Sequence, residues 1–201
     1  MADFSQQLEK VSAFFNAENL AAQNINYAGE IALLVIDVQK TFCDPDHYRG
    51  NAETAEVAKR IKSIVPEFRK AGIPVYAVYF SIEEKQAPQI DFYEFTPEAD
   101  DVLIRKNLNS AFSGGKLKDI LQKDQRKLLL TCGFNLNACV YQTAVDAVKE
   151  EFEVCVLRDL TGNDNNHRHE KPEDFLTGLR YNGIAIEQSG KVLDLIGGLT
   201  R

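Results

Sequence analysis

The stretch IALLVID, residues 31–37, constrains the fold strongly, because six apolar residues follow one another without interruption and end in an acid. A strand or helix with one side facing water would show polar residues at a regular period. An unbroken apolar run of this length is typical of a strand that other elements cover on both faces. Residues 31–37 therefore predict a fully buried strand.

Comparable strand patterns recur along the chain and alternate with helical patterns. This alternation predicts an α/β fold, with a doubly wound, mostly parallel six-stranded sheet and helices on both faces, as in Rossmann-like proteins. Pro66 is expected either to kink the helix over residues 52–72 or to start a second turn of helix there. The expected strands are 31–37, 73–80, 101–106, 126–133, 153–159 and 184–188, and the expected helices are 52–72, 114–123, 137–152 and 171–183.

The chain shows no internal repeat and no linker, so residues 1–201 are expected to form a single domain. Before the opening strand, apolar residues at helical spacing, such as Phe4, Leu8 and Val11, predict an amphipathic helix over residues 4–22. Residues 1–25 are therefore interpreted as an N-terminal extension of that domain.

Charge and hydropathy exclude several classes of protein. The net charge of −7, from 30 acidic and 23 basic residues, disfavours a nucleic-acid-binding surface. No apolar run approaches the roughly 18 residues of a membrane span, and the N-terminus does not resemble a secretory signal. The expected compartment is the cytoplasm, where the four cysteines would be free thiols.

Three reactive residue types are expected at one edge of the sheet. Asp37 follows the first strand, Lys106 ends the third, and Cys139 follows a glycine turn after the fourth. Ligands of open parallel sheets bind at the carboxyl ends of the strands, so an acid, an amine and a thiol could converge there. Each residue taken alone also has an ordinary structural interpretation.

The four cysteines differ in their expected roles. Cys132 and Cys155 lie within strand patterns and are expected to pack in the core, and Cys43 is a weaker rival nucleophile. Cys139 is expected at a helix N-terminus, where the backbone N–H groups and a nearby lysine would lower the pKa of its thiol. A carboxylate could accept the thiol proton and later deliver it to a leaving amine.

Three segments resemble the isochorismatase-like cysteine hydrolases, in the order found in that family. These segments are LLVIDVQKTF, IRKNLNSAF and GFNLNACVYQTAVDA, and the resemblance spans roughly residues 30–190. It implies a catalytic triad of Asp37, Lys106 and Cys139. It also implies a cis peptide bond between Phe134 and Asn135, which would direct the N–H groups of Asn135 and Cys139 at an oxyanion.

Further roles follow from the same resemblance. Gln39, Phe42, Phe112 and Tyr141 are expected to line the substrate pocket, and Gln39 is also expected to order the neighbouring loop. Thr143 is expected to be structural. Nicotinamidases of the family bind a metal through histidines after the second strand, and residues 78–95 contain no histidine, so neither a metal nor another cofactor is expected.

The resulting hypothesis is a cysteine-dependent hydrolase that cleaves a small amide, carbamoyl or ureido compound through a thioester intermediate. Two alternatives remain open: an isochorismatase-type hydrolase of a vinyl ether, and a non-catalytic binding or regulatory protein on the same scaffold. The resemblance also implies a homo-oligomer, either a dimer or a tetramer. The expected partners are a small-molecule substrate and other copies of the chain, without nucleic acid or membrane.

Overall fold

The computed structural model describes residues 27–84 and 89–199, and the helix predicted over residues 4–22 lies outside them. The described residues form a six-stranded sheet in the order β3-β2-β1-β4-β5-β6, in which every neighbouring pair is parallel. The predicted α/β fold class is therefore confirmed. The strands are β1 Ile31–Ile36, β2 Val75–Phe80, β3 Val102–Lys106, β4 Leu128–Phe134, β5 Glu153–Gly162 and β6 Ala185–Glu187.

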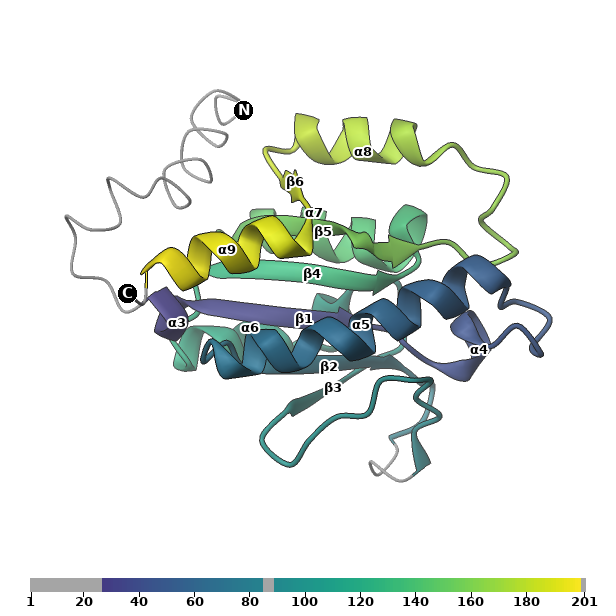
Figure 1. Ribbon diagram of the computed structural model, residues 1–201, viewed down its shortest axis with the longest axis horizontal. Helices are drawn as coiled ribbons and strands as arrows, with labels where there is room; N and C mark the ends of the chain where they lie inside the picture. The colour runs from purple at the N-terminus through teal and green to yellow at the C-terminus, as the bar shows by residue number, and fades with distance from the viewer. Residues whose placement is uncertain (1–26, 85–88, 200–201) are drawn as a thin grey trace.

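Helices cover both faces of the sheet (Figure 1). Helices α5 (Ala52–Lys70) and α9 (Ser189–Leu199) lie on one face, and α6 (Lys116–Lys123), α7 (Tyr141–Lys149) and α8 (Pro172–Tyr181) contribute to the core on the other. Shorter elements connect them. These are α3 Tyr27–Glu30, α4 Lys40–Cys43, the 3₁₀ helix η2 Ala111–Gly114 and the π-helix η3 Leu136–Val140.

The position of strand β1 explains why polar residues do not recur in its sequence at a regular spacing. Ile31, Leu33 and Val35 pack into the core cluster that includes α5, whereas Leu34 and Ile36 pack into the cluster that includes α7. Every residue of the strand is buried. The unbroken apolar run is thus required by the position of β1 between two helical layers.

Helix α5 begins and packs as its sequence predicts. The Asn51 side chain accepts a hydrogen bond from the Thr54 N–H, and the Thr54 hydroxyl accepts one from the Asn51 N–H, which forms a capping box. Val57, Ile61 and Val65 then recur at helical spacing on the buried face. The helix continues through Pro66 and ends only at Lys70, so the proline does not interrupt it.

Several boundaries differ from the predictions. Helix α9 and the short helices α3 and α4 had not been predicted, and β5 continues to Gly162 with a register shift against β4. The helix expected over 137–152 is divided into η3 and α7. Cys139 therefore lies in a π-helix rather than in the first turn of an α-helix.

The strand order places the switch of chain direction between β1 and β4. From these two central strands the chain moves outward, through β2 and β3 on one side and through β5 and β6 on the other. Ligand sites in open α/β sheets lie at such a point, outside the carboxyl ends of the strands. Here β1 is followed by Asp37, and β4 leads into η3 through Asn135.

Gly133 makes the close approach of β1 and β4 possible. Its φ is +111°, and a Cβ added there would lie 1.9 Å from the Ile36 carbonyl oxygen. We expect Gly133→Ala to lower the free energy of unfolding by about 3 kcal/mol, since both the backbone conformation and the contact are unfavourable. Urea denaturation monitored by circular dichroism measures this change.

Gly190→Ala is the matched control for that variant. A Cβ added to Gly190, in α9, meets no atom within 4 Å, and its backbone conformation is ordinary for a helix. Alanine there should raise stability by about 0.5–1 kcal/mol. Equal destabilisation by the two substitutions would contradict the role assigned to Gly133.

Candidate active site

Three side chains from distant parts of the chain meet beside the ends of β1 and β4. The Lys106 ammonium lies 2.7 Å from Oδ2 of Asp37 and donates a hydrogen bond of 3.2 Å to Sγ of Cys139. Asp37 has a φ of 53°, a left-handed conformation that aspartate adopts more readily than most residues. The structure thus brings the acid, the amine and the thiol of the predicted triad into direct contact.

All three groups are shielded from water. Asp37 is 0% exposed, Lys106 is 1% exposed and Cys139 is 7% exposed. Burial raises the pKa of the Asp37 carboxyl, and the attraction of Lys106 opposes this effect only in part. Burial acts to lower the pKa of Lys106, but the Asp37 carboxylate and Cys139 outweigh it and leave that pKa raised.

The pKa of the Cys139 thiol is raised in the structure, whereas the sequence analysis predicted that it would be lowered. Burial, followed by the neighbouring Asp37 carboxylate, raises the pKa of Cys139 to about 12, and Lys106 counteracts them incompletely. The prediction was wrong because the sequence does not reveal how deeply the sulfur is buried. With its pKa raised in this way, the resting thiol is protonated at neutral pH, and the Asp37 carboxyl group lies beside it.

We expect alkylation of Cys139 by iodoacetamide to be slow at pH 7 and to accelerate about tenfold per pH unit up to pH 10. The thiolate reacts, and its fraction rises with pH as long as the pH is below the thiol pKa. Peptide mass mapping at each pH provides the rate for each cysteine. A Cys139 rate that reaches a plateau near pH 7 would show a lowered pKa and contradict this assignment.

Lys106 is held in place by its surroundings. Its ammonium donates a hydrogen bond of 3.1 Å to the Leu108 carbonyl and lies 5.1 Å from the centroid of the Phe80 ring. The following segment is tied to α7, because the Thr143 hydroxyl accepts a hydrogen bond of 3.0 Å from the Ala111 N–H. The segment that carries the amine is thus attached to the helix that follows the thiol.

Sequence reasoning missed Phe80, although this residue ends the strand predicted over 73–80 and so lies where functional residues were expected. Phe80 ends β2 and is the direct partner of Lys106 across the β2–β3 pair. The carboxyl end of this strand therefore contributes to the same edge as the other strand ends.

The turn between β4 and η3 contains a cis peptide bond between Phe134 and Asn135. The Asn135 side chain accepts a hydrogen bond of 2.6 Å from the Asp164 N–H, so the turn is attached to the segment after β5. Asp164 is fully buried and forms an ion pair of 2.6 Å with Arg49. The Arg49 guanidinium lies 4.6 Å from the centroid of the Phe42 ring. No sequence signal joined Arg49 to Asp164, which lie 115 positions apart, because neither residue directly follows a predicted strand.

The other residues expected to line the pocket have defined contacts. The Gln39 amide donates to Asp91 and accepts from the Phe80 N–H, so it joins the end of β2 to the segment around Asp91. Phe42 is buried beneath Arg49, and the Tyr141 ring packs edge-on against Phe175 of α8.

Phe112 lies in η2, and it lines an open groove beside the Lys106 segment.

The other three cysteines, Cys43, Cys132 and Cys155, are fully buried, and burial is the largest cause that raises the pKa of each thiol.

Within residues 27–84 and 89–199, no group of three or more His, Cys, Asp or Glu side chains could hold a metal ion. The same ranges contain no helix with the length and apolar character needed to cross a bilayer.

The fold and this cluster of side chains define a class of protein: a doubly wound α/β protein with a thiol, a carboxylate and an amine at its topological switch point. The sequence profile of the Isochorismatase domain matches residues 31–177. The chain belongs to the isochorismatase family and is a hydrolase of that family.

Individual relatives are distant. The secreted isochorismatase effector Isc1 of Verticillium dahliae is 25% identical over 140 residues, which are 65% of this chain and 72% of that protein. The maleamate amidohydrolase of Pseudomonas putida is 23% identical over 180 residues, which are 79% and 84% of the two chains. The crystal structure of a cysteine hydrolase from Pseudomonas syringae pv. phaseolicola superposes with a TM-score of 0.76 at 21% identity and covers 87% of this chain and 95% of that one.

Proposed function

We propose that the protein is a cysteine-dependent hydrolase of a small amide, carbamoyl or ureido compound and acts through a thioester intermediate. The observation that carries this proposal is the position of the Lys106 ammonium, 2.7 Å from the Asp37 carboxylate and 3.2 Å from the Cys139 sulfur. A nucleophile, a base and a cation in contact are the groups that acyl transfer requires.

In the first step, Asp37 accepts the proton of the Cys139 thiol while the sulfur attacks the substrate carbonyl carbon. An S–C bond forms, and the carbonyl oxygen becomes an oxyanion that backbone N–H groups of the 134–139 turn would stabilise. The C–N bond then breaks, and Asp37 returns its proton to the departing amine. The raised pKa of Asp37 suits this exchange, because it brings the carboxyl closer to the operating pH.

In the second step, water hydrolyses the thioester. Asp37 accepts a proton from the water molecule, whose oxygen bonds to the acyl carbon, and the C–S bond breaks. The sulfur regains a proton, and a carboxylic or carbamic acid leaves. Throughout, Lys106 would stabilise the negative charge that develops on the sulfur.

The similarity to maleamate amidohydrolase, a relative named for hydrolysing an amide, supports an amide as the substrate. The chain covers 84% of that relative's length. The test is a screen of purified protein against small carboxamide, carbamoyl and ureido compounds, with detection of released ammonia and of the acid product. Hydrolysis of at least one class at a rate well above the uncatalysed reaction is expected. Failure of all classes would favour a non-catalytic role for the scaffold.

A vinyl-ether hydrolase is the second candidate, and the name of the Verticillium dahliae effector favours it. An acid that protonates the vinyl ether suffices for that reaction, so the thiol would be unnecessary. Activity on isochorismate that survives Cys139→Ala but is lost in Asp37→Asn would support this candidate over the first.

We further propose that residues 1–201 form one domain and that the protein is a cytoplasmic homo-oligomer. Light scattering after gel filtration tests the oligomer. A dimer or tetramer is expected, and a monomer at micromolar concentration would overturn this part of the proposal.

A further inference from the structure

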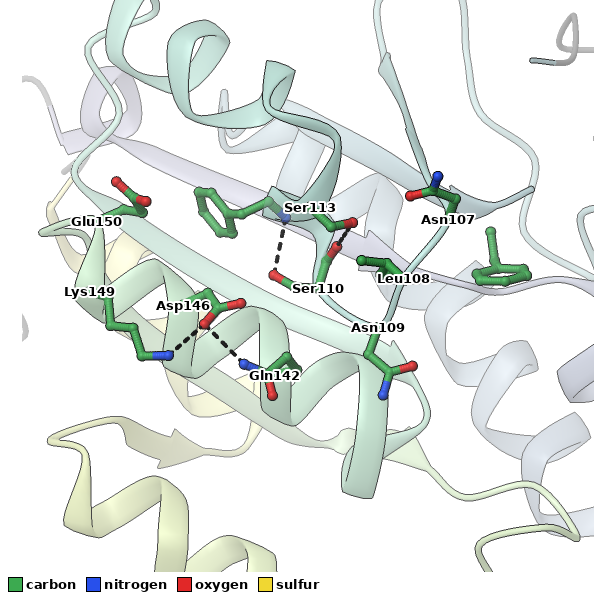
Figure 2. Close-up of a pocket in the computed structure, with 11 residues that line it drawn as sticks. Asn107, Leu108, Asn109, Ser110, Ser113, Gln142, Asp146, Lys149 and Glu150 are labelled. Carbon is green, nitrogen blue, oxygen red and sulfur yellow. Dashed lines mark hydrogen bonds and ion pairs between the residues drawn. The ribbon is translucent and has the colours of Figure 1, made fainter. Parts of the chain in front are cut away.

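An open groove lies beside the triad, and none of its lining residues takes part in the proposed hydrolysis. Its volume is about 700 Å³, within the range of small-molecule sites. Figure 2 shows Asn107, Leu108 and Asn109 along one side and Gln142, Asp146 and Lys149 of α7 along the other. Ser110 and Ser113 lie between them and are joined by a hydrogen bond.

Two residues connect the groove to the triad. Phe80 lines the groove, and its ring centroid lies 5.1 Å from the Lys106 ammonium. Leu108 also lines the groove, and its carbonyl accepts a hydrogen bond of 3.1 Å from the same ammonium. A substrate whose reacting carbonyl lies at Cys139 could therefore extend past these residues into the groove.

The charges of the groove disfavour an anion. Asp146 and Glu150 contribute two carboxylates, against the single ammonium of Lys149. Asp146 accepts a hydrogen bond of 2.8 Å from Lys149, and Glu150 pairs at 2.5 Å with Lys118, outside the groove. Because both carboxylates already hold the neighbouring ammonium groups, a carboxylate bound there would find no cation free of a partner among these residues.

The remaining polar groups of the groove suit a neutral ligand. Asn107 and Asn109 form no hydrogen bond with the described residues, and the Gln142 amide nitrogen donates to Asp146. Each carboxamide has both donors and an acceptor, the same set that an amide or a urea presents. The apolar surfaces of Phe80, Leu108 and Phe112 could cover a short methylene chain.

We propose that this groove is a subsite for the non-reacting end of the substrate, and that it selects a neutral amide or urea group. This inference rests on the proposed function and specifies its substrate class. The expected substrates thus carry a cleavable amide at one end and a second amide or urea group, a few bonds away, at the other.

Three probes with the same reacting carboxamide test the proposal: succinamide, succinamate and butyramide, which end in an amide, a carboxylate and a methyl group. The wild-type KM is expected to be about tenfold lower for succinamide than for either of the others, as two neutral hydrogen bonds would give. In Asn109→Leu and in Gln142→Leu, substitutions on opposite walls, the ratio of KM values should fall towards one. Gln122→Leu, on the exposed side of α6, should keep the wild-type ratio.

A binding measurement keeps the subsite testable without turnover. Ligand-detected NMR should show succinamide binding to the Cys139→Ala variant, and the added Asn109→Leu substitution should weaken it at least threefold. Hydrolysis of all three probes with no preference, or a preference for succinamate, would overturn the subsite while leaving the proposed function intact. Absence of succinamide binding, or binding that Asn109→Leu does not change, would also overturn it.

Discussion

Replacing Cys139 with alanine should abolish amide hydrolysis, with a loss in kcat of roughly 10⁴-fold or more, as is typical when a nucleophile is removed. The substitution deletes the sulfur but retains the ion pair between Asp37 and Lys106, so stability should change by less than about 1 kcal/mol. Steady-state kinetics on the best amide from the screen measure the first effect, and urea denaturation measures the second.

Cys155→Ala is the control for that prediction. Cys155 is also a buried cysteine, with 0% of its surface exposed. It lies in β5 and packs in the cluster on the α5 side of the sheet, away from Asp37 and Lys106. Its loss should cost about 1 kcal/mol of stability and leave kcat near the wild-type value. Similar kinetic effects of the two substitutions would mean that Cys139 acts only through the fold.

Replacing Lys106 with methionine should destabilise the protein by about 3–5 kcal/mol, because the Asp37 carboxylate would remain buried without its cation. Catalysis should also fail, since nothing would stabilise charge on the Cys139 sulfur. Adding Asp37→Asn to Lys106→Met should restore much of the stability, because both buried charges are then gone, but none of the activity. The free energies of unfolding of the wild type, the two single variants and the double variant, measured by chemical denaturation, form a double-mutant cycle that tests this.

The stability of Lys106→Met should also depend on pH in a defined direction. Without the ammonium, burial alone would raise the pKa of Asp37 further above its ordinary value in the unfolded chain, about 3.9. The folded variant then binds the proton more tightly than the unfolded chain does. Its stability should fall as pH rises above about 4 and level off above the folded-state pKa. An unfolding free energy that rises over this interval would contradict the assignment.

The apolar runs predicted the fold well because the physics behind them is local to each element. Ile31, Leu33 and Ile36 must be apolar in a strand covered on both sides, and the resulting pattern is visible in the sequence. Helix α9 was missed, since glycines interrupt its short apolar pattern; among the side chains of this helix that the structure describes, Val192 and Ile196 are the buried apolar ones.

The candidate site was partly predictable for a different reason. The topology of a doubly wound sheet brings strand ends together, so Asp37 and Lys106 could be expected near the turn that carries Cys139. The pKa of Cys139 could not be predicted, because it depends on the burial of the sulfur and on its distance from Asp37. The contact between Arg49 and Asp164 depends equally on tertiary structure.

The most direct measurement is the mass of the protein during turnover. Samples mixed with the best amide substrate and quenched in acid within milliseconds to seconds should contain protein heavier by the acyl group, with the added mass on the peptide that carries Cys139. Hydroxylamine added before the quench should convert this thioester into the corresponding hydroxamate. Full turnover with Cys139 unmodified at every quench time and no hydroxamate formed would contradict the thioester mechanism.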